Sequence, residues 1–141
     1  MLKIFITATD TDAGKTYAAQ ALVHALVTSE KKVAVFKPIS AGCERVNGNL
    51  VNDDALLLLK QSNCQQTIAE VNPIAFELAI APHIAAAQQQ QVISLADIAK
   101  NYEKIVALAP DVIVCEGAGG GVYHLAMEHS YLSLYKQAIK M

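Results

Sequence analysis

The sequence predicts a domain of the α/β class, in which helices flank a parallel sheet. Short β-branched and apolar runs at 2–8, 33–37 and 111–115 have the length of buried strands. Helical patterns of apolar residues separate them, as in parallel strands joined by crossover helices. The first and last runs lead into glycine-bearing loops. Because ligands of parallel sheets gather beyond the carboxyl ends of the strands, we expect both loops to face one crevice.

The first half of the chain predicts a strand–helix–strand unit. The runs 2–8 and 33–37 are the strands, and residues 15–29 between them have apolar residues at helical spacing. Pro38 ends the second strand, and the Gly- and Asn-bearing stretch 41–52 predicts a loop.

Helices and one more strand are expected after that loop. Residues 53–61 form a short helix that Asn52 or Asp53 can cap. A strand is expected around 75–78. A helix that starts at Pro82 and another that follows Ser94 complete the pattern before the run 111–115, since proline suits the first helical position and serine suits the cap.

Composition limits the function classes. A chain of 141 residues with 53% apolar and 17% charged residues is long enough to bury roughly 68% of its unfolded surface, and it is not disordered. No apolar run approaches the length of a membrane span, and a net charge of −2 predicts no general affinity for nucleic acid or membranes. The first residues lack a secretory signal pattern, so we expect a cytoplasmic protein. Cys43, Cys64 and Cys115 have no C-x-x-C spacing and are interpreted as reduced structural thiols.

The first strand-to-helix junction has the ending of a phosphate-binding loop. The stretch T-D-T-D-A-G-K-T at 9–16 ends in G-K-T, although Thr9 replaces the usual leading glycine. Backbone amides at a helix start and the charge of Lys15 favour phosphate, and the hydroxyl of Thr16 suits a metal ion. The alternative is a plain turn with a solvated lysine. The residues that we assign to nucleotide binding here are Asp12, Ala13, Gly14, Lys15, Thr16 and Tyr17.

Charged residues end two other elements of the expected sheet. Mg²⁺ prefers carboxylate and hydroxyl oxygens, and candidates are Glu116, which follows a buried strand, and Asp53 or Asp54 at a helix start. Lys37 ends the second strand, where a cation would offset charge during phosphoryl transfer. A helix cap is the alternative for the aspartates, and a solvated charge is the alternative for the lysine.

Six blocks in order resemble the dethiobiotin synthetases of biotin biosynthesis, over residues 1 to about 121. The blocks are T-D-T-D-A-G-K-T at 9–16, K-P-I-S-A-G at 37–42, N-D-D-A at 52–55, V-N-P-I-A-F-E at 71–77, A-P-H at 81–83 and C-E-G-A-G-G at 115–120. The resemblance implies a P-loop NTPase-like fold over residues 1–121. It also implies a ligase that uses ATP and Mg²⁺ to close the ureido ring of dethiobiotin from 7,8-diaminopelargonate and CO₂, and a homodimer in the full-length family.

The family pattern also implies roles for individual residues. Lys37, Lys15 and Thr11 would be catalytic. The metal ligands would be Thr16, Asp54 and Glu116, and the substrate contacts would be Thr11, Lys37, Ser40 and Ala41. Further nucleotide contacts would come from Asp54, Glu116, Gly117, Ala118 and Gly119.

The chain departs from the family pattern in three places. Ala8 stands where the family has glycine, and Ala41 stands where it has a substrate-contacting serine, which leaves open whether Ser40 replaces that contact. Residues 122–141 are a divergent tail, in which the near-helical spacing of Leu132, Tyr135 and Ile139 predicts a helix packed over the exposed sheet. We therefore expect a C-terminally truncated member whose sheet is incomplete on that side. An uncovered strand edge near 111–115 and little turnover would follow.

Three alternatives stay open at this point. One is an inactive fragment that retains weak nucleotide binding. Another is the ATPase domain of a cobalamin-synthesis amidotransferase, whose phosphate loop is similar. The third is a partitioning or regulatory ATPase, which Asp10 disfavours because those proteins have a lysine at that position.

Overall fold

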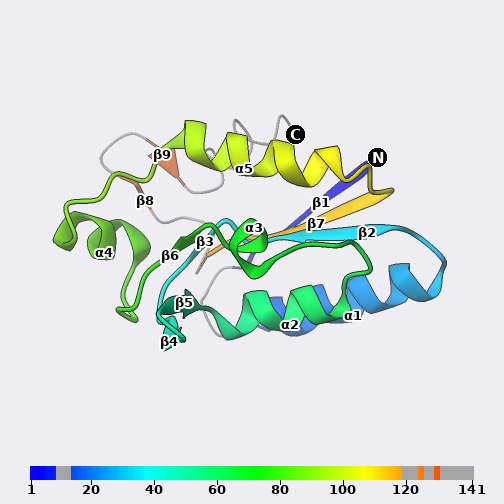
Figure 1. Ribbon diagram of the computed structural model, residues 1–141, viewed down its shortest axis with the longest axis horizontal. Helices are drawn as coiled ribbons and strands as arrows, with labels where there is room; N and C mark the ends of the chain where they lie inside the picture. Colours follow the sequence, from blue (N-terminus) through cyan, green and yellow to red (C-terminus); the bar gives the residue numbers. More distant parts are fainter. Residues whose placement is uncertain (9–13, 119–123, 126–128, 131–141) are drawn as a thin grey trace.

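A parallel sheet of three strands forms the centre of the molecule. The computed structural model describes residues 1–8, 14–118, 124–125 and 129–130 (Figure 1). Strand β7 (Val112–Glu116) lies between β1 (Leu2–Ile6) and β2 (Val33–Phe36), and both pairings are parallel. The expected α/β class is confirmed. The prediction of an uncovered edge near 111–115 was wrong, because β7 has a partner on each side.

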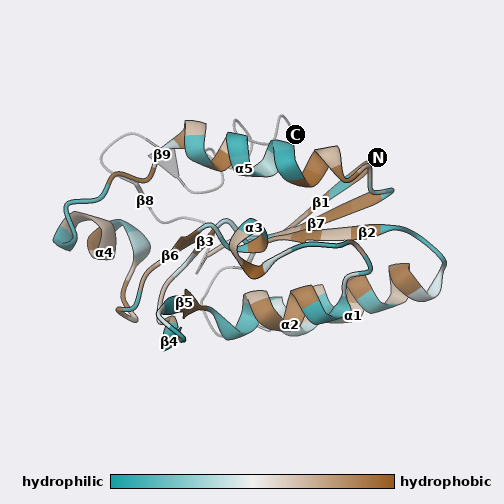
Figure 2. Ribbon diagram, in the orientation of Figure 1, coloured by the Kyte–Doolittle hydropathy of each residue, from teal (hydrophilic) through white to brown (hydrophobic). Residues whose placement is uncertain are grey.

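Helices cover both faces of this sheet (Figure 1). Helices α1 (Lys15–Thr28) and α2 (Asp53–Gln61) lie on one face, and α5 (Leu95–Ala107) lies on the other. Side chains of β2 and β7 alternate between two apolar clusters, one with α1 and α2 and one with α5. Both strands are buried on both faces, which explains their continuous apolar runs (Figure 2).

Helix starts follow the capping residues in the sequence. The side chain of Asn52 accepts a hydrogen bond from the N–H of Ala55 at 3.1 Å and caps α2, and Ser94 caps α5 in the same way. Pro82 is the first residue of α4 (Pro82–Gln88), as expected. None of the helices in the described part of the chain combines the length and apolarity that crossing a bilayer requires.

Several short elements were absent from the sequence-based prediction. The predicted loop 41–52 contains a hairpin of β4 (Glu44–Val46) and β5 (Asn49–Val51), and helix α3 (Ile68–Val71) follows later. Strand β3 (Ile39–Ser40) pairs in parallel with β6 (Ile74–Ala75). The strand predicted at 75–78 is therefore shorter and starts one residue earlier.

Only four residues of the tail 122–141 are described. They form a short antiparallel pair of β8 (His124–Leu125) and β9 (His129–Ser130). The helix predicted from Leu132, Tyr135 and Ile139 lies outside the described residues.

Two side-chain amides close the outer edge of β2. Asn63 accepts a hydrogen bond from the N–H of Val33 at 2.7 Å and donates one to the carbonyl of Lys31 at 2.9 Å. Gln66 forms the same pair of bonds with the N–H and carbonyl of Val35, both at 2.9 Å. These amides satisfy main-chain groups that an exposed edge strand would offer to another chain.

Candidate functional site

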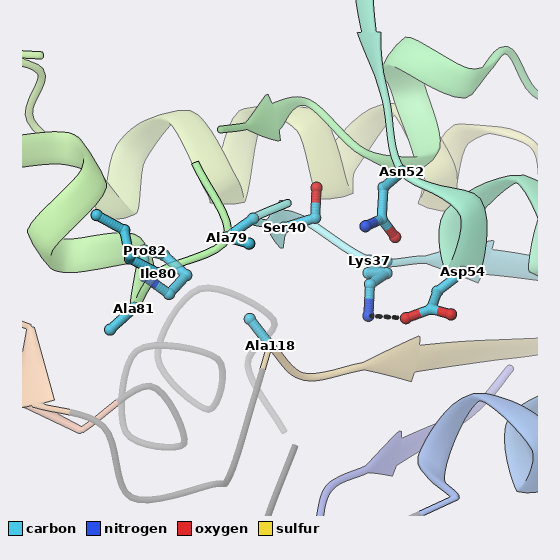
Figure 3. Close-up of a pocket in the computed structure, with 10 residues that line it drawn as sticks. Lys37, Ser40, Asn52, Asp54, Ala79, Ile80, Ala81, Pro82 and Ala118 are labelled. Atoms are coloured by element: carbon cyan, nitrogen blue, oxygen red, sulfur yellow. Dashed lines mark ion pairs between the residues drawn. The ribbon is translucent and has the colours of Figure 1, made fainter. Parts of the chain in front are cut away.

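Three charged side chains meet at the carboxyl end of the sheet. Glu116 is the last residue of β7, Lys37 directly follows β2, and Asp54 lies in the first turn of α2. The Lys37 ammonium donates a hydrogen bond to Oε1 of Glu116 at 2.7 Å. It also lies 3.8 Å from Oδ2 of Asp54, the ion pair drawn in Figure 3. The hydroxyl of Thr16, in the first turn of α1, donates to the same Glu116 oxygen at 2.8 Å. The structure therefore brings together four residues that we predicted separately.

Burial sets the electrostatics of this group. Glu116 is fully buried and Lys37 is 4% exposed, whereas the Asp54 side chain is 46% exposed. The second oxygen of Glu116, Oε2, has no hydrogen-bond partner among the described residues. Buried carboxylate oxygens are normally satisfied, because an unpaired one costs free energy. A site with a spare buried oxygen suits a bound cation.

The donor set fits Mg²⁺. Glu116 and Asp54 offer carboxylates and Thr16 offers a hydroxyl, and these are the hard oxygen donors that Mg²⁺ takes while it keeps several waters. In the part of the chain that the structure describes, no group of three or more His, Cys, Asp or Glu residues is placed to hold a metal ion. These residues can therefore supply only part of an octahedral shell, and substrate oxygens and water would supply the rest.

Helix α1 starts at the predicted phosphate loop. Gly14 is its N-cap residue, with φ of 80°, and no side chain in the described part of the chain caps the helix. Glycine populates this left-handed conformation without the strain of a Cβ atom. Lys15 is 6% exposed, and Tyr17 points into solvent with 82% exposure. The backbone amides of a helix start, beside a lysine, suit an anion. The predicted residues Thr11, Asp12 and Ala13 lie outside the described residues.

A cavity of about 390 Å³ opens beside Lys37 (Figure 3). Its polar side is formed by Lys37, Ser40, Asn52 and Asp54. Its apolar side is formed by Ala41, Ala79, Ile80, Ala81, Pro82 and Ala118. The cavity can therefore hold a small molecule that has charged groups at one end and hydrocarbon at the other.

The hydroxyl of Ser40 is already engaged within the protein. Ser40 is 1% exposed and donates a hydrogen bond to Oδ1 of Asn72 at 2.7 Å, and its oxygen lies 3.1 Å from the sulfur of Cys43. Figure 3 shows its hydroxyl and the Lys37 ammonium pointing in opposite directions. The substrate contacts that we predicted for Ser40 and Ala41 stay predictions, although both residues line the cavity.

The second glycine-bearing loop starts close to β1. The N–H of Gly117 donates to the carbonyl of Ile6 at 3.0 Å, and a Cβ atom at this position would come within 3.0 Å of the Phe5 ring. Ala118 is 6% exposed and lines the cavity. Gly119 lies outside the described residues. The loop thus brings the chain from Glu116 directly to the cavity.

Sequence reasoning missed Asn72 and the apolar side of the cavity at 79–82. Asn72 lies 35 residues from Lys37 in sequence, and its side chain donates to the Lys37 carbonyl at 2.7 Å. Neither its residue type nor its spacing indicates this contact. No binding role is predicted from the sequence for 79–82, although A-P-H at 81–83 is one of the family blocks.

Together the parallel sheet, the lysine and threonine at the start of α1 and the acidic end of β7 define a nucleotide-binding domain of the P-loop type. A family model described as "AAA domain" matches residues 2–138. The chain belongs to this family.

Curated relatives carry one common description, ATP-dependent dethiobiotin synthetase. The protein of Idiomarina loihiensis is 50% identical over 122 residues, which are 86% of this chain and 55% of the relative. The protein of Alteromonas mediterranea is 41% identical over 150 residues, covering all of this chain and 64% of the relative. The protein of Aeromonas salmonicida is 41% identical over 133 residues, which are 94% of this chain and 59% of the relative. The predicted resemblance to dethiobiotin synthetases is confirmed, and the chain spans between half and two-thirds of these relatives' length.

Proposed function

We propose that this chain contains the phosphoryl-transfer centre of an ATP-dependent dethiobiotin synthetase, which converts 7,8-diaminopelargonate and CO₂ to dethiobiotin in biotin biosynthesis. One observation carries the proposal. A buried lysine and a buried glutamate form an ion pair at the carboxyl end of the sheet, beside the start of α1 and a cavity of about 390 Å³. The relatives are described as ATP-dependent dethiobiotin synthetases, which supports the reaction, and the family resemblance of the sequence blocks implies the substrates.

The nucleotide would bind between the two glycine-bearing loops. The amides at the start of α1 and the Lys15 ammonium would hold the phosphates, with Thr11 beside the γ-phosphate. Thr16, Asp54 and Glu116 would hold Mg²⁺. When it is bound, this ion neutralises phosphate charge and orients the phosphoryl oxygens.

Lys37 would act on the reacting groups. One amine of the substrate adds to CO₂ and forms a carbamate, and a carbamate oxygen then displaces ADP from the γ-phosphorus to give a mixed anhydride. The second amine attacks the carbamate carbon, the ureido ring closes and phosphate leaves. The Lys37 ammonium, directed to the end of the cavity, would stabilise the negative charge of the carbamate and the transferred phosphoryl group. Holding the reactants side by side supplies effective concentration, so no covalent nucleophile is needed.

The test combines a binding assay with a turnover assay on the purified chain. Calorimetry with Mg²⁺ and a non-hydrolysable ATP analogue should show binding that Lys15→Ala weakens at least about tenfold and the exposed-site variant Lys100→Ala leaves unchanged. Labelled CO₂ should enter dethiobiotin slowly, and only when ATP and the diamine are both present, and Lys37→Ala should abolish this reaction. If neither nucleotide binding nor product is found, the proposal is wrong.

A second candidate is a nucleotide-binding chain without turnover. The observation that favours it is the share of the relatives that the chain spans, 55–64% in the alignments above. Mg²⁺-dependent nucleotide binding without product would support this candidate. An assay with a corrin acid in place of the diamine separates these two candidates from a cobalamin-type amidotransferase, because only the amidotransferase would act on the corrin acid.

The cytoplasmic location, and the homodimer that the resemblance implies for the full-length family, belong to the same proposal. The resemblance to the dethiobiotin synthetases supports both. Light scattering of the purified chain tests the dimer, and fractionation of cells that express it tests the location.

A further inference from the structure

The main chain of Lys37 is held by two consecutive residues at the end of α3, its last residue Val71 and its C-cap Asn72. The ladder between β2 and β7 ends at the pair Phe36 and Cys115, so Lys37 lies just beyond it, and Pro38 comes next. The N–H of Lys37 donates to the carbonyl of Val71 at 2.9 Å, and its carbonyl accepts from Nδ2 of Asn72 at 2.7 Å. These residues replace the sheet as the partners of the Lys37 backbone.

Asn72 is itself fixed at both ends of its amide. It is 6% exposed, its N–H donates to the carbonyl of Ile68 at 2.8 Å, and its Oδ1 accepts the hydroxyl proton of Ser40. The Lys37 carbonyl has no proton to donate, so only the amide nitrogen of Asn72 can face it, and the amide oxygen must then face Ser40. This chain of bonds from Ser40 through Asn72 to Lys37 has one orientation.

We infer that Asn72 is a positioning residue: by holding the main chain of Lys37, Asn72 sets where the lysine ammonium lies in the site. The inference rests on the proposed role of Lys37 in phosphoryl transfer. The ammonium must reach Glu116 at 2.7 Å while it stays 3.8 Å from Asp54, at the end of a side chain with four rotatable bonds. A fixed main chain narrows the volume that this ammonium samples. A misplacement of roughly 1 Å at a catalytic group can cost a hundredfold in rate.

The chain contains a matched control for this inference. Asn63 also uses both ends of its amide on the main chain next to β2, where it accepts from Val33 and donates to Lys31. That clamp lies at the opposite end of β2 from Lys37. Asn63→Ala therefore removes the same kind of hydrogen bonds without contact with the site.

The experiment compares Asn72→Ala, Asn72→Asp and Asn63→Ala. The first readout is the ammonium NMR signal of Lys37 in ¹⁵N-lysine-labelled protein, assigned with Lys37→Arg. We expect Asn72→Ala to shift or broaden this signal and Asn63→Ala to leave it unchanged. Asn72→Asp keeps the volume but replaces the donor with an oxygen, so it should act like Asn72→Ala. The same NMR result in both Asn72 variants shows that the lost donor, and not a cavity, is responsible.

The second readout is steady-state kinetics. Each Asn72 variant should lower kcat about 10- to 100-fold, which is the usual effect of removing a residue that orients a ligating or reacting group, with KM for ATP within about threefold of the native value. Asn63→Ala should change neither. Ser40→Ala keeps the Asn72 donor and removes only its support, so it should give a smaller loss and serves if the Asn72 variants do not fold.

The outcomes separate this inference from the proposed function. An unchanged Lys37 signal in both Asn72 variants, or equal changes in Asn72→Ala and Asn63→Ala, would overturn the positioning role. A native chain that forms no dethiobiotin would count against the proposed activity, and the NMR comparison would still decide the role of Asn72.

Discussion

The ammonium of Lys37 lies 2.7 Å from Oε1 of Glu116, and the exposed fractions of the two residues are 4% and 0%. Burial removes the hydration of both charges, so each charged group depends on its partner for electrostatic stabilisation. The pair connects the end of β2 with the end of β7. The site is therefore also a part of the fold whose stability depends on charge balance.

Breaking this pair should destabilise the protein strongly. Lys37→Met leaves the buried charge of Glu116 without its partner, and Glu116→Gln does the same to Lys37. We expect each single variant to lower the free energy of unfolding by about 3–5 kcal/mol. The double variant Lys37→Met/Glu116→Gln has no buried charge at this pair and should regain most of the loss. Urea unfolding of the four proteins measures the coupling energy.

The ion pair between Arg45 and Glu77 is the control for that cycle. Its atoms lie 2.9 Å apart, but the two side chains are 56% and 54% exposed. Exposed pairs contribute about 0–1 kcal/mol, because water and salt screen them. Similar coupling energies in the two cycles would contradict the argument from burial.

Under the proposed function, the Lys37 ammonium and a divalent cation compete for Glu116. Two unit charges about 4 Å apart interact by about 4 kcal/mol at an effective dielectric constant of 20, so the ammonium should weaken cation binding. We expect Lys37→Gln to raise the affinity for Mn²⁺, measured by electron paramagnetic resonance without nucleotide, at least about tenfold. Lys104→Gln, on the solvent side of α5, should have no effect. An unchanged affinity in Lys37→Gln would show that the cation does not use Glu116.

The sequence predicted the elements of the central fold because their causes are local. The apolar run before Glu116, the Asn52 and Ser94 caps and the proline at the start of α4 each act within a few residues. Strand order has no such local cause. The position of β7 between β1 and β2 depends on how three distant segments pair, so the expectation of an open edge at 111–115 failed.

The site was predictable where its residues end strands or begin helices. The carboxyl ends of parallel strands share one edge, so Lys37 and Glu116 had to lie close together, and the start of α2 adds Asp54. The support behind Lys37 was not predictable, because the contact between Asn72 and Lys37 joins positions 35 residues apart through a side chain. The short hairpin at 44–51 could have been recognised, since its turn contains Asn47-Gly48, a strong hairpin dipeptide.

Gly14→Ala should lower both stability and nucleotide affinity. Gly14 has φ of 80°, and a Cβ atom there would meet no atom of the described residues within 4 Å, so we expect backbone strain to set the cost. A left-handed conformation costs an alanine about 1–2 kcal/mol. The matched variant is Gly48→Ala in the β4–β5 turn, where φ is 84° and the space is equally open. We expect similar losses in urea unfolding, whereas only Gly14→Ala should weaken binding of the Mg²⁺–nucleotide complex. Equal nucleotide affinities in the two variants would argue against a phosphate site at the start of α1.

The last prediction concerns alkaline pH. Complete burial in β7 raises the pKa of the Cys115 thiol from the ordinary 9.0 to about 12. Between these values the unfolded chain loses this proton and the folded chain keeps it. Ionisation of the Cys115 thiol should therefore leave the free energy of unfolding unchanged below pH 9.0. It should lower the free energy of unfolding from there to about pH 12.

Cys115→Ala tests this linkage. One proton corresponds to a slope of at most about 1.4 kcal/mol per pH unit, and the variant should lose up to that much of the alkaline slope. Burial also raises the pKa of Tyr102, which packs in the same apolar cluster, so part of the slope should stay in the variant. Val114→Ala, next in the strand and equally buried, removes packing without a titrating group and should shift the whole curve downward in parallel. If Cys115→Ala also gave only a parallel shift, its thiol would ionise equally in both states, and burial in β7 would not protect it.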